Sequence, residues 1–344
     1  MKALKWYAKG DLRLQDVPEP TPKAGEVKVK VKFAGICGSD LHEYEMGPVF
    51  VDLGGSDSII LGHEFAGDVV EVGAGVDSLK VGDRVAGDAP QYCGSCYYCR
   101  RNMLQLCEKG VYTGLHIDGA FAEYLVVPAY TCYRLPNDVS YEVGAVIEPL
   151  EVATHAIAKA EVKLGDTVAI VGAGTIGLSV LLLARAAGAA KIYTLELIKE
   201  RGERAVKMGA AKYFNPNEVD VVQTLKELTD GRGVDVAFDC AGTPASGPLA
   251  MSLTRRAGTV AIVGMSYQPT PDFQWVNFML NDQKFVGCIG YAHDAYAILD
   301  LLADGRIDPT PMITGKVSLK DAEDKGFKEM IHHPEKTVKI LVQP

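Results

Sequence analysis

Four of the eight cysteines in this chain fall within fifteen residues, at Cys93, Cys96, Cys99 and Cys107. Two residues separate each of the first three and seven separate the third from the fourth, which can place four thiolates around one tetrahedral Zn²⁺. Such a site leaves no open position for a substrate, so its role is structural. The alternatives are disulfides, disfavoured in a reducing compartment, and an iron–sulfur cluster. The spacing favours structural zinc, in a lobe formed by residues 93–107.

A second set of possible metal ligands is dispersed along the chain: Cys37, His63 and Glu64, with Glu148 or Glu151 as a further carboxylate. A thiolate, an imidazole and a carboxylate suit a catalytic Zn²⁺ that keeps one position for water or substrate. Taken alone, these residues allow a plainer interpretation. A single cysteine is commonly a small core residue, and a single histidine is often only hydrogen-bonded. The sequence does not decide between Glu148 and Glu151 as the metal-binding carboxylate.

A glycine-rich segment begins where an apolar strand is expected to end and a helix to start. The residues of its G-x-G-x-x-G pattern expected to meet a cofactor are Gly172, Gly174, Thr175, Ile176 and Gly177. The first glycine allows a tight turn, the second lets the backbone approach a pyrophosphate, and the third packs the helix on the strand. The free N–H groups at the helix start receive the anion. A tight turn without a ligand is the alternative, but the strand-to-helix context predicts a dinucleotide site.

An acidic residue, Glu196, follows the next expected strand, 24 positions after Gly172. A carboxylate there can accept hydrogen bonds from the adenosine ribose hydroxyls and repels a 2′-phosphate, which favours NAD over NADP. A solvated surface glutamate is the alternative interpretation. Arg201, five residues later, is expected to cover the adenine.

The elements that must position these residues change in character along the chain. In residues 26–33, valines and a phenylalanine alternate with lysines, the period of two typical of a half-buried strand. Short strands with frequent glycine turns predict a barrel-like β domain in the N-terminal half. From about Pro149, apolar strands alternate with helices, which predicts a doubly wound parallel sheet. The tail from about Gly287 holds one amphipathic helix and a final strand at 337–342.

The composition is that of an ordinary globular protein of two or three domains, with 344 residues, 48% hydrophobic and 23% charged. The formal net charge is −9 and no basic run is present, which argues against a nucleic acid partner. The first residues lack the apolar core of a signal peptide. The longest apolar run, around 180–187, is interrupted by Arg185 and is too short to cross a membrane. We therefore expect no membrane partner and a cytoplasmic location.

The motifs occur in the order of a known family. The zinc signature of that family is matched position for position by Gly62-His63-Glu64-x2-Gly67-x5-Gly73-x2-Val76. The other matching segments are Gly35-Ile36-Cys37-Gly38-Ser39-Asp40-Leu41-His42, the four-cysteine lobe and Glu148-Pro149-Leu150. On these four motifs the chain resembles, over essentially its whole length, the zinc-dependent medium-chain alcohol dehydrogenases. It departs from them at Asn102 and Gln105, where the lobe often has Gly and Asn, and at Glu151, where relatives often have a small residue.

The resemblance implies a fold of class α/β plus β. Residues 1–149 would form a GroES-like β-barrel catalytic domain that includes the zinc lobe at 93–107. Residues 150–286 would form a Rossmann NAD-binding domain, and residues 287–344 would return to the catalytic domain. The resemblance also implies two zinc ions per chain, one catalytic and one structural, and a homodimer or homotetramer.

Site roles are carried over residue by residue. The implied ligands of the catalytic zinc are Cys37, His63, Glu148 (directly or through water) and, exchangeably, Glu64. Ser39 is expected to bond the substrate hydroxyl, and His42 to pass its proton to solvent through the cofactor ribose. Asp40 is expected to orient His63, because metal-bound histidines commonly donate their second N–H to a carboxylate.

These roles imply an NAD-linked oxidoreductase that interconverts an alcohol and its ketone. A zinc ion lowers the pKa of a bound alcohol, which favours hydride transfer to the nicotinamide. A nucleotide-binding protein without catalysis is the alternative from another class. Relatives of that kind have usually lost the zinc ligands, whereas Cys37, His63, Glu64 and Glu148 are all present here.

Two subfamilies are closest, the 2,3-butanediol and the polyol (sorbitol-type) dehydrogenases. The segments that resemble the butanediol group are His42-Glu43-Tyr44-x2-Gly47-Pro48 and Gly287-Cys288-Ile289-Gly290-Tyr291. Polyol enzymes typically carry, where Gly290 stands, an arginine that holds a sugar hydroxyl. We therefore expect a short vicinal diol, 2,3-butanediol with acetoin as its ketone, whose methyl groups pack on Phe50 and Tyr44. A polyol or L-threonine (oxidised at carbon 3) is the alternative substrate.

Overall fold

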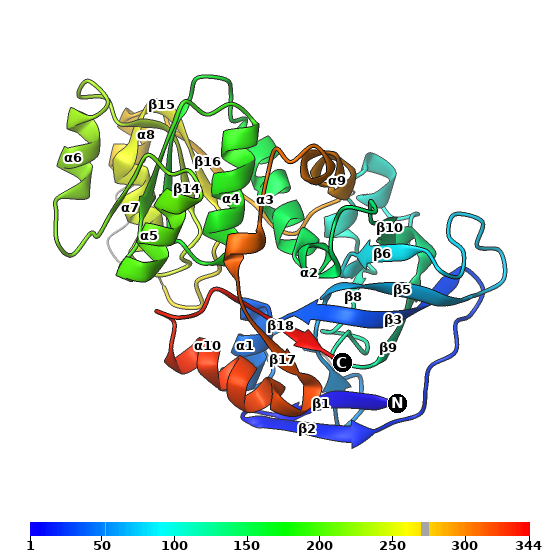
Figure 1. The fold of residues 1–344 in the computed structure, drawn as a ribbon. Coiled ribbons are helices and arrows are strands. Elements are labelled where there is room, and N and C mark those ends of the chain that lie inside the picture. Colours follow the sequence, from blue (N-terminus) through cyan, green and yellow to red (C-terminus); the bar gives the residue numbers. More distant parts are fainter. Residues whose placement is uncertain (52, 270–274, 293) are drawn as a thin grey trace. The chain divides into compact units, whose positions relative to one another are not determined.

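The computed structural model describes residues 1–51, 53–269, 275–292 and 294–344, which form two compact units (Figure 1). Unit 1 comprises Met1–Glu148, Ala295–Gly305 and Met312–Pro344, and unit 2 comprises Pro149–Asp294 and Arg306–Pro311. The sequence placed the return to the β-rich domain at residue 287. Residues 287–294 belong instead to unit 2, because the strand that ends at Gly287 is paired into the sheet of that unit.

Unit 2 is built on a six-stranded parallel sheet in the order β13-β12-β11-β14-β15-β16. Its strands are β11 (Thr167–Val171), β12 (Lys191–Leu195), β13 (Lys212–Phe214), β14 (Val234–Asp239), β15 (Thr254–Ile262) and β16 (Lys284–Gly287). The order reverses between β11 and β14, which is where doubly wound sheets bind their ligands, beyond the carboxyl ends of the strands. The predicted parallel sheet is therefore present.

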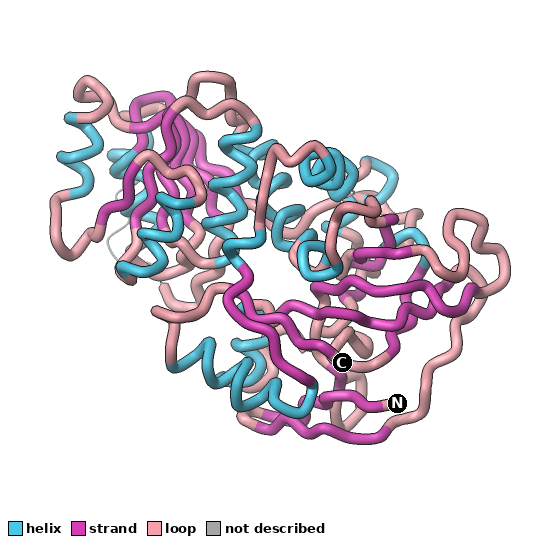
Figure 2. Tube along the Cα trace, in the orientation of Figure 1, coloured by secondary structure: helices cyan, strands magenta, loops and turns pink. Residues whose placement is uncertain are grey.

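Helices connect these strands and cover the sheet (Figure 2). They are α3 (Ile147–Ala160), α4 (Thr175–Ala186), α5 (Lys199–Lys207), α6 (Val221–Glu227), α7 (Ser246–Leu253) and α8 (Trp275–Leu280). Helix α4 follows the glycine-rich turn and is buried continuously from Gly177 to Ala184. That burial fits a helix that is apolar nearly all round and lies against a sheet.

Unit 1 holds a seven-stranded sheet in the order β10-β6-β5-β3-β18-β17, with β9 also paired to β3. The strands are β3 (Glu26–Gly35), β5 (Glu64–Val72), β6 (Arg84–Gly87), β9 (Tyr124–Pro128), β10 (Cys132–Arg134), β17 (Ile313–Ser318) and β18 (Lys339–Gln343). Strands β17 and β18 run parallel and side by side, and the other pairs are antiparallel (Figure 1). Among the described residues the pairing does not close into the expected barrel, because β10 and β17 remain unpaired edges of this sheet.

Smaller elements complete unit 1. A three-stranded sheet has the order β2-β1-β4, from β1 (Lys2–Ala8), β2 (Asp11–Asp16) and β4 (Ile59–Ile60), and β7 (Pro90–Gln91) pairs with β8 (Val111–Tyr112). The helices are α1 (Gly38–Met46), α2 (Tyr141–Gly144), α9 (Ala295–Ala303) and α10 (Lys328–His332). Short turns of helix are η1 (Cys99–Arg101), η2 (Leu104–Leu106), η3 (Ala129–Thr131), η5 (Leu319–Asp321) and the π-helix η6 (Ala322–Phe327). A further turn, η4 (Thr310–Met312), lies where the chain passes from unit 2 back into unit 1. No helix within the described ranges is long and apolar enough to cross a membrane.

The core of unit 1 explains the alternation seen in the sequence. Val27, Val29 and Val31 of β3 are buried and join one apolar cluster with Trp6 and Phe121. Lys28 is also buried, contrary to the simple alternation, because its ammonium lies 2.8 Å from Glu19 and 2.5 Å from Glu71. A buried lysine is tolerated when opposite charges compensate it. The strand thus supplies a rigid base immediately before Cys37.

Candidate active site

Cys37 lies between the end of β3 and the first turn of α1. Its N–H donates to the Asp40 carboxylate at 2.8 Å, which satisfies one of the amide groups left open at a helix start. Asp40 is fully buried and also accepts the N–H of Gly62 at 3.3 Å. This one carboxylate therefore ties the segment of Cys37 to the segment that carries His63.

His63 and Glu64 follow a turn that only glycine fits. Gly62 has φ +93°, and a Cβ there would stand 2.8 Å from the ring of Phe121. The turn brings ligand atoms of Cys37, His63 and Glu64 to within 4.8 Å of one another, all in buried or half-buried positions. Thiolate, imidazole and carboxylate are the donors that a catalytic zinc takes, so this set fits the metal.

The electrostatics of His63 point the same way. Burial lowers the pKa of His63, but the charges of Cys37, Asp40 and Glu148 outweigh burial and raise that pKa well above its ordinary value. So much negative charge around one imidazole suits a cation. Asp40 does not hold the ring as the sequence suggested: its Oδ1 lies 3.8 Å from His63 Nδ1, beyond hydrogen-bond distance.

Sequence reasoning missed Lys339, which lies in β18 and is 1% exposed. Its ammonium donates to both carboxylate oxygens of Glu64, at 2.6 and 2.7 Å, and to the carbonyl of Ile36 at 2.8 Å. Burial lowers the pKa of Lys339, but Glu64 and Cys37 raise it above its ordinary value, so the lysine stays charged. The available signal was a lone lysine inside the apolar run 337–342.

The two other carboxylates lie one turn apart on helix α3. Glu148 is in the first turn and is buried, and its charge raises the pKa of both His63 and Tyr112. It lies outside the compact group of Cys37, His63 and Glu64. Glu151 is fully buried and belongs to unit 2, which begins at Pro149.

The residues expected to handle the proton lie on α1. Ser39 Oγ is 3.5 Å from His63 Nε2, so the hydroxyl lies beside the cluster of possible zinc ligands. His42 is three residues further, on the same side of the helix, and is half-buried. Burial lowers the pKa of His42, which leaves its imidazole neutral and able to accept a proton near neutral pH.

The four-cysteine lobe is also assembled. The sulfurs of Cys93 and Cys99 are 3.9 Å apart, and those of Cys96 and Cys107 are 4.0 Å apart. A tetrahedral zinc with Zn–S bonds of about 2.3 Å requires sulfurs about 3.8 Å apart, whereas a disulfide requires about 2 Å. The backbone N–H of Ser95 lowers the pKa of Cys93 to about 6, and the N–H of Cys99 lowers that of Cys96, whereas burial raises the pKa of Cys99 to about 12, so this thiol needs the metal to hold it as a thiolate. These features fit thiolate ligands of a closed zinc site.

The substitutions in this lobe are accommodated. Asn102 has φ 56° at the end of η1, the left-handed conformation that glycine would otherwise supply and that asparagine tolerates. Gln105 lies in η2, where its carbonyl accepts a hydrogen bond from the Tyr112 hydroxyl at 3.2 Å. The lobe therefore keeps a definite conformation with both departures.

The glycine-rich segment forms the turn between β11 and α4. Gly172 has φ +99°, and a Cβ on Gly177 would stand 1.9 Å from the carbonyl oxygen of Gly172. Gly174 precedes the helix, and Thr175 and Ile176 are its first two residues. Strand, turn and helix therefore have the arrangement that presents helix N–H groups to a phosphate.

Glu196 and Arg201 lie against this turn. One oxygen of Glu196 accepts the N–H of Ala173 at 2.7 Å, and the other accepts the N–H groups of Leu197 and Ile198 at 2.8 and 3.0 Å. Arg201 Nη1 lies 4.0 Å from the position that a Cβ of Gly174 would take. The structure thus brings both predicted residues to the glycine turn.

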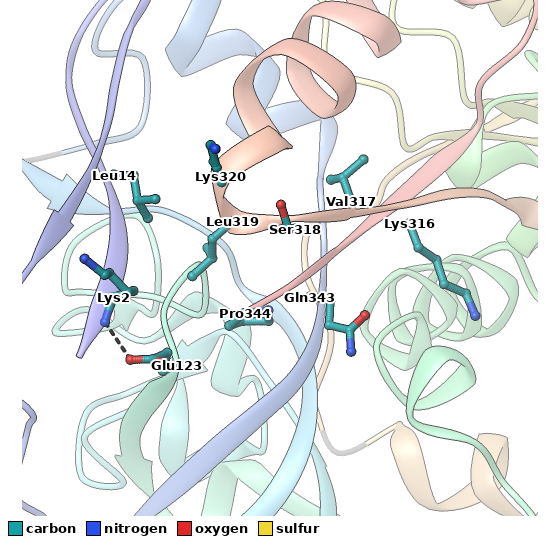
Figure 3. A pocket seen from close by; sticks show the side chains of 10 residues that line it. All are labelled: Lys2, Leu14, Glu123, Lys316, Val317, Ser318, Leu319, Lys320, Gln343 and Pro344. Atoms are coloured by element: carbon teal, nitrogen blue, oxygen red, sulfur yellow. Dashed lines mark hydrogen bonds between the residues drawn. The ribbon is translucent and has the colours of Figure 1, made fainter.

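A surface hollow of about 430 Å³ lies elsewhere in unit 1, lined by residues that include Lys2, Glu123, Lys316 and Pro344 (Figure 3). None of the predicted site residues lines it. Lys2 and Lys316 already form ion pairs with Asp16 and Glu142, each at 2.6 Å. The hollow is therefore not part of the candidate active site.

Two family profiles match the chain: "Alcohol dehydrogenase GroES-like domain" over residues 23–137 and "Zinc-binding dehydrogenase" over residues 175–304. The chain is 37% identical to the (R,R)-butanediol dehydrogenase of Bacillus subtilis, over all of both chains. It is 35% identical to the sorbitol dehydrogenase of the same organism, over all of this chain and 97% of that protein.

Among solved structures, the 2R,3R-butanediol dehydrogenase of Bacillus subtilis superposes with a TM-score of 0.92 at 37% identity. The match covers all of this chain and 99% of that one. The two profiles together span more than two thirds of the sequence, and the first of them covers the cysteine lobe and the Cys37–His63 pair. The chain therefore belongs to the zinc-binding alcohol dehydrogenase family and is an oxidoreductase.

Proposed function

We propose that this protein interconverts a short vicinal diol and its hydroxyketone, 2,3-butanediol and acetoin, with zinc and NAD. The observation that carries the proposal is the buried group of Cys37, His63 and Glu64, with the Ser39 hydroxyl 3.5 Å from His63. We assign Cys37 and His63 as zinc ligands, Glu148 as the third, direct or through water, and Glu64 as an exchangeable one. Unit 1 is then the catalytic domain and unit 2 the cofactor domain.

The bound zinc supplies Lewis-acid stabilisation of the alcohol oxygen, and NAD accepts the hydride. The remaining chemistry belongs to side chains of α1. Ser39 Oγ accepts the proton of the substrate hydroxyl while it gives up its own hydroxyl proton, and neutral His42 would receive a proton through the cofactor ribose and release it to solvent. Lys339 donates to both oxygens of the Glu64 carboxylate, so Glu64 approaches the metal only when that ion pair opens.

The choice of a diol rests on two supports. The relatives that share 37% and 36% identity over the full chain are (R,R)-butanediol dehydrogenases, of Bacillus subtilis and Neisseria gonorrhoeae. In addition, Gly290 has φ +58°, a left-handed conformation that disfavours the arginine expected there in polyol enzymes. A polyol remains the second candidate, because a sorbitol dehydrogenase is nearly as similar, at 35% identity.

We also propose that the protein is a homo-oligomer that associates through α8 and β16. No residue of α8 is buried. Its large apolar side chains Trp275, Met279 and Leu280 are 70%, 66% and 68% exposed to solvent. Strand β16 ends the unit 2 sheet, and in the described part of the chain no strand pairs with its outer edge. A second copy placed against this edge would cover both the apolar side chains and the open strand.

A cytoplasmic location is part of the proposal. All eight cysteines are free thiols, and four of them, Cys93, Cys96, Cys99 and Cys107, form the zinc lobe. Thiols that must bind metal stay reduced in the cytoplasm, whereas an oxidising compartment favours disulfides. We propose that the site binds a small-molecule alcohol or ketone as its substrate.

Zinc content tests the two metal sites. Wild-type protein should hold two zinc ions per chain. Cys96→Ser should lose one of them and lower the melting temperature, because a closed zinc site contributes folding free energy. His63→Ala should lose the other and abolish turnover while the fold persists. The measurement is elemental analysis with thermal unfolding. Cys288→Ser, outside both clusters, is the control, and unchanged zinc in Cys96→Ser would contradict the structural site.

Cofactor choice tests Glu196. We expect kcat/KM with NAD to exceed that with NADP at least tenfold, which needs only about 1.4 kcal/mol of discrimination. Glu196→Ala removes the charge and the acceptor for the ribose, so it should narrow the preference by weakening NAD binding and by removing the repulsion toward NADP. Glu203→Ala, an exposed change on α5, is the matched control. Equal use of both cofactors by wild type would show that Glu196 does not face the ribose.

Substrate choice is tested by a kinetic series with NAD over 2,3-butanediol stereoisomers, 1,2-propanediol, sorbitol, xylitol and threonine. We expect 2,3-butanediol oxidation and acetoin reduction to lead in kcat/KM. Each extra hydroxyl of a sugar alcohol weakens the binding free energy by about 1–3 kcal/mol if it is buried without a hydrogen-bond partner. A polyol ahead of every short diol would place the enzyme in the polyol group, and threonine ahead of both would make it a threonine dehydrogenase.

The oligomer is tested by sedimentation velocity. Wild type should sediment as a dimer or tetramer, and Leu280→Asp should shift it toward smaller species by placing a charge in the apolar contact. Val81→Asp, which changes a single exposed apolar residue of unit 1, should leave the mass unchanged. A monomeric wild type would overturn the proposal.

A further inference from the structure

We infer that Glu43 is a positioning residue for the substrate: its carboxylate holds the loop of residues 47–51 against the helix that carries Ser39 and His42. The inference rests on the proposed function, because it assigns this loop to the diol. Glu43 has no role in the proposed proton path, and it belongs to neither group of possible zinc ligands.

Glu43 is placed by the same short helix as the proton-handling residues. It follows His42 directly and lies four residues after Ser39, one helical turn, so its side chain projects from the same side of α1 as Ser39. It is 0% exposed. A carboxylate in such a buried position is tolerated only when hydrogen bonds from the protein replace those of water.

Those hydrogen bonds come from three consecutive residues of the loop after α1. Oε2 of Glu43 accepts the N–H of Val49 at 2.9 Å, and Oε1 accepts the N–H groups of Phe50 at 2.6 Å and Val51 at 3.2 Å. The chain reverses toward Glu43 at Gly47, whose φ is +98° and whose N–H donates to the Glu43 carbonyl at 3.1 Å. One side chain thus fixes the backbone of the whole turn.

The consequence concerns Phe50. Val51 is buried in the core of unit 1, whereas Phe50 is half-buried in the middle of the turn. Because its N–H is held 2.6 Å from Glu43, the backbone of Phe50 is tied to the helix that carries Ser39. The other aromatic expected to meet the diol, Tyr44, is 8% exposed, donates to Glu323 at 2.8 Å and packs on Phe327. Of the two aromatic residues expected to meet the diol, Phe50 is therefore the one left to contact its methyl groups.

The test is Glu43→Gln, which keeps the volume of the side chain but presents an NH₂ group to one of the loop N–H groups. We expect the KM for acetoin and for 2,3-butanediol to rise about tenfold and kcat to change by less than about threefold. Zinc content and the dissociation constant for NADH should not change. Amide hydrogen exchange in a peptide covering 47–51 should accelerate. Glu45→Gln makes the same chemical change two residues away, on the exposed side of α1, and should behave as wild type.

A double-mutant cycle separates positioning from simple stabilisation. If Glu43 acts through Phe50, the KM of the variant Glu43→Gln with Phe50→Ala should be no higher than that of Phe50→Ala alone. Additive effects, or a lower melting temperature with an unchanged KM and unchanged loop exchange, would overturn the inference. If wild type turned over no diol, the proposed function would fail by itself. The loop exchange, and the KM for whichever alcohol is accepted, would still decide the role of Glu43.

Discussion

A single buried ammonium holds together the strands that make the candidate site. Lys339 bonds both oxygens of Glu64 and the carbonyl of Ile36, so it joins β18 to β5 and to the segment just before Cys37. Removing one member of such a pair leaves an uncompensated buried charge and destabilises a protein by about 3–5 kcal/mol. The positions of Cys37 and His63 depend on the strands that this ion pair connects.

The ion pair between Lys339 and Glu64 requires a glycine beside the Glu64 carboxylate. A Cβ on Gly35 would stand 2.0 Å from an oxygen of Glu64, so that carboxylate can reach Lys339 only over a glycine. Asp40 connects two further segments of the site, because its carboxylate accepts the N–H of Cys37 and the N–H of Gly62. Asp40, Glu64 and Lys339 are each hydrogen-bonded in this buried region, and satisfied polar networks of this kind make a site rigid.

The features visible in the sequence were local ones. The period of two in β3, the turn that opens α4 and the spacing of the cysteine lobe each need only neighbouring residues, and these predictions can be made without coordinates. Lys339 could not be foreseen, since nothing local links it to a glutamate 275 residues away. The contact expected between Asp40 and His63 is too long for a hydrogen bond, because Asp40 is committed to backbone amides. The open edges of the unit 1 sheet also depend on long-range pairing.

The place of β18 has a consequence for how the protein is made. Leu341 pairs with Gly35 across about 300 residues of chain, and the whole of unit 2 is synthesised between them. At about 5–20 residues per second, a ribosome needs roughly 15–60 s to cover that distance. During this interval the end of β3, at Ala34 and Gly35, lacks its partner strand β18, and Glu64 lacks its counter-ion. The nascent chain is therefore most exposed to misfolding, and to binding of a metal other than zinc at Glu64, before β18 has been synthesised.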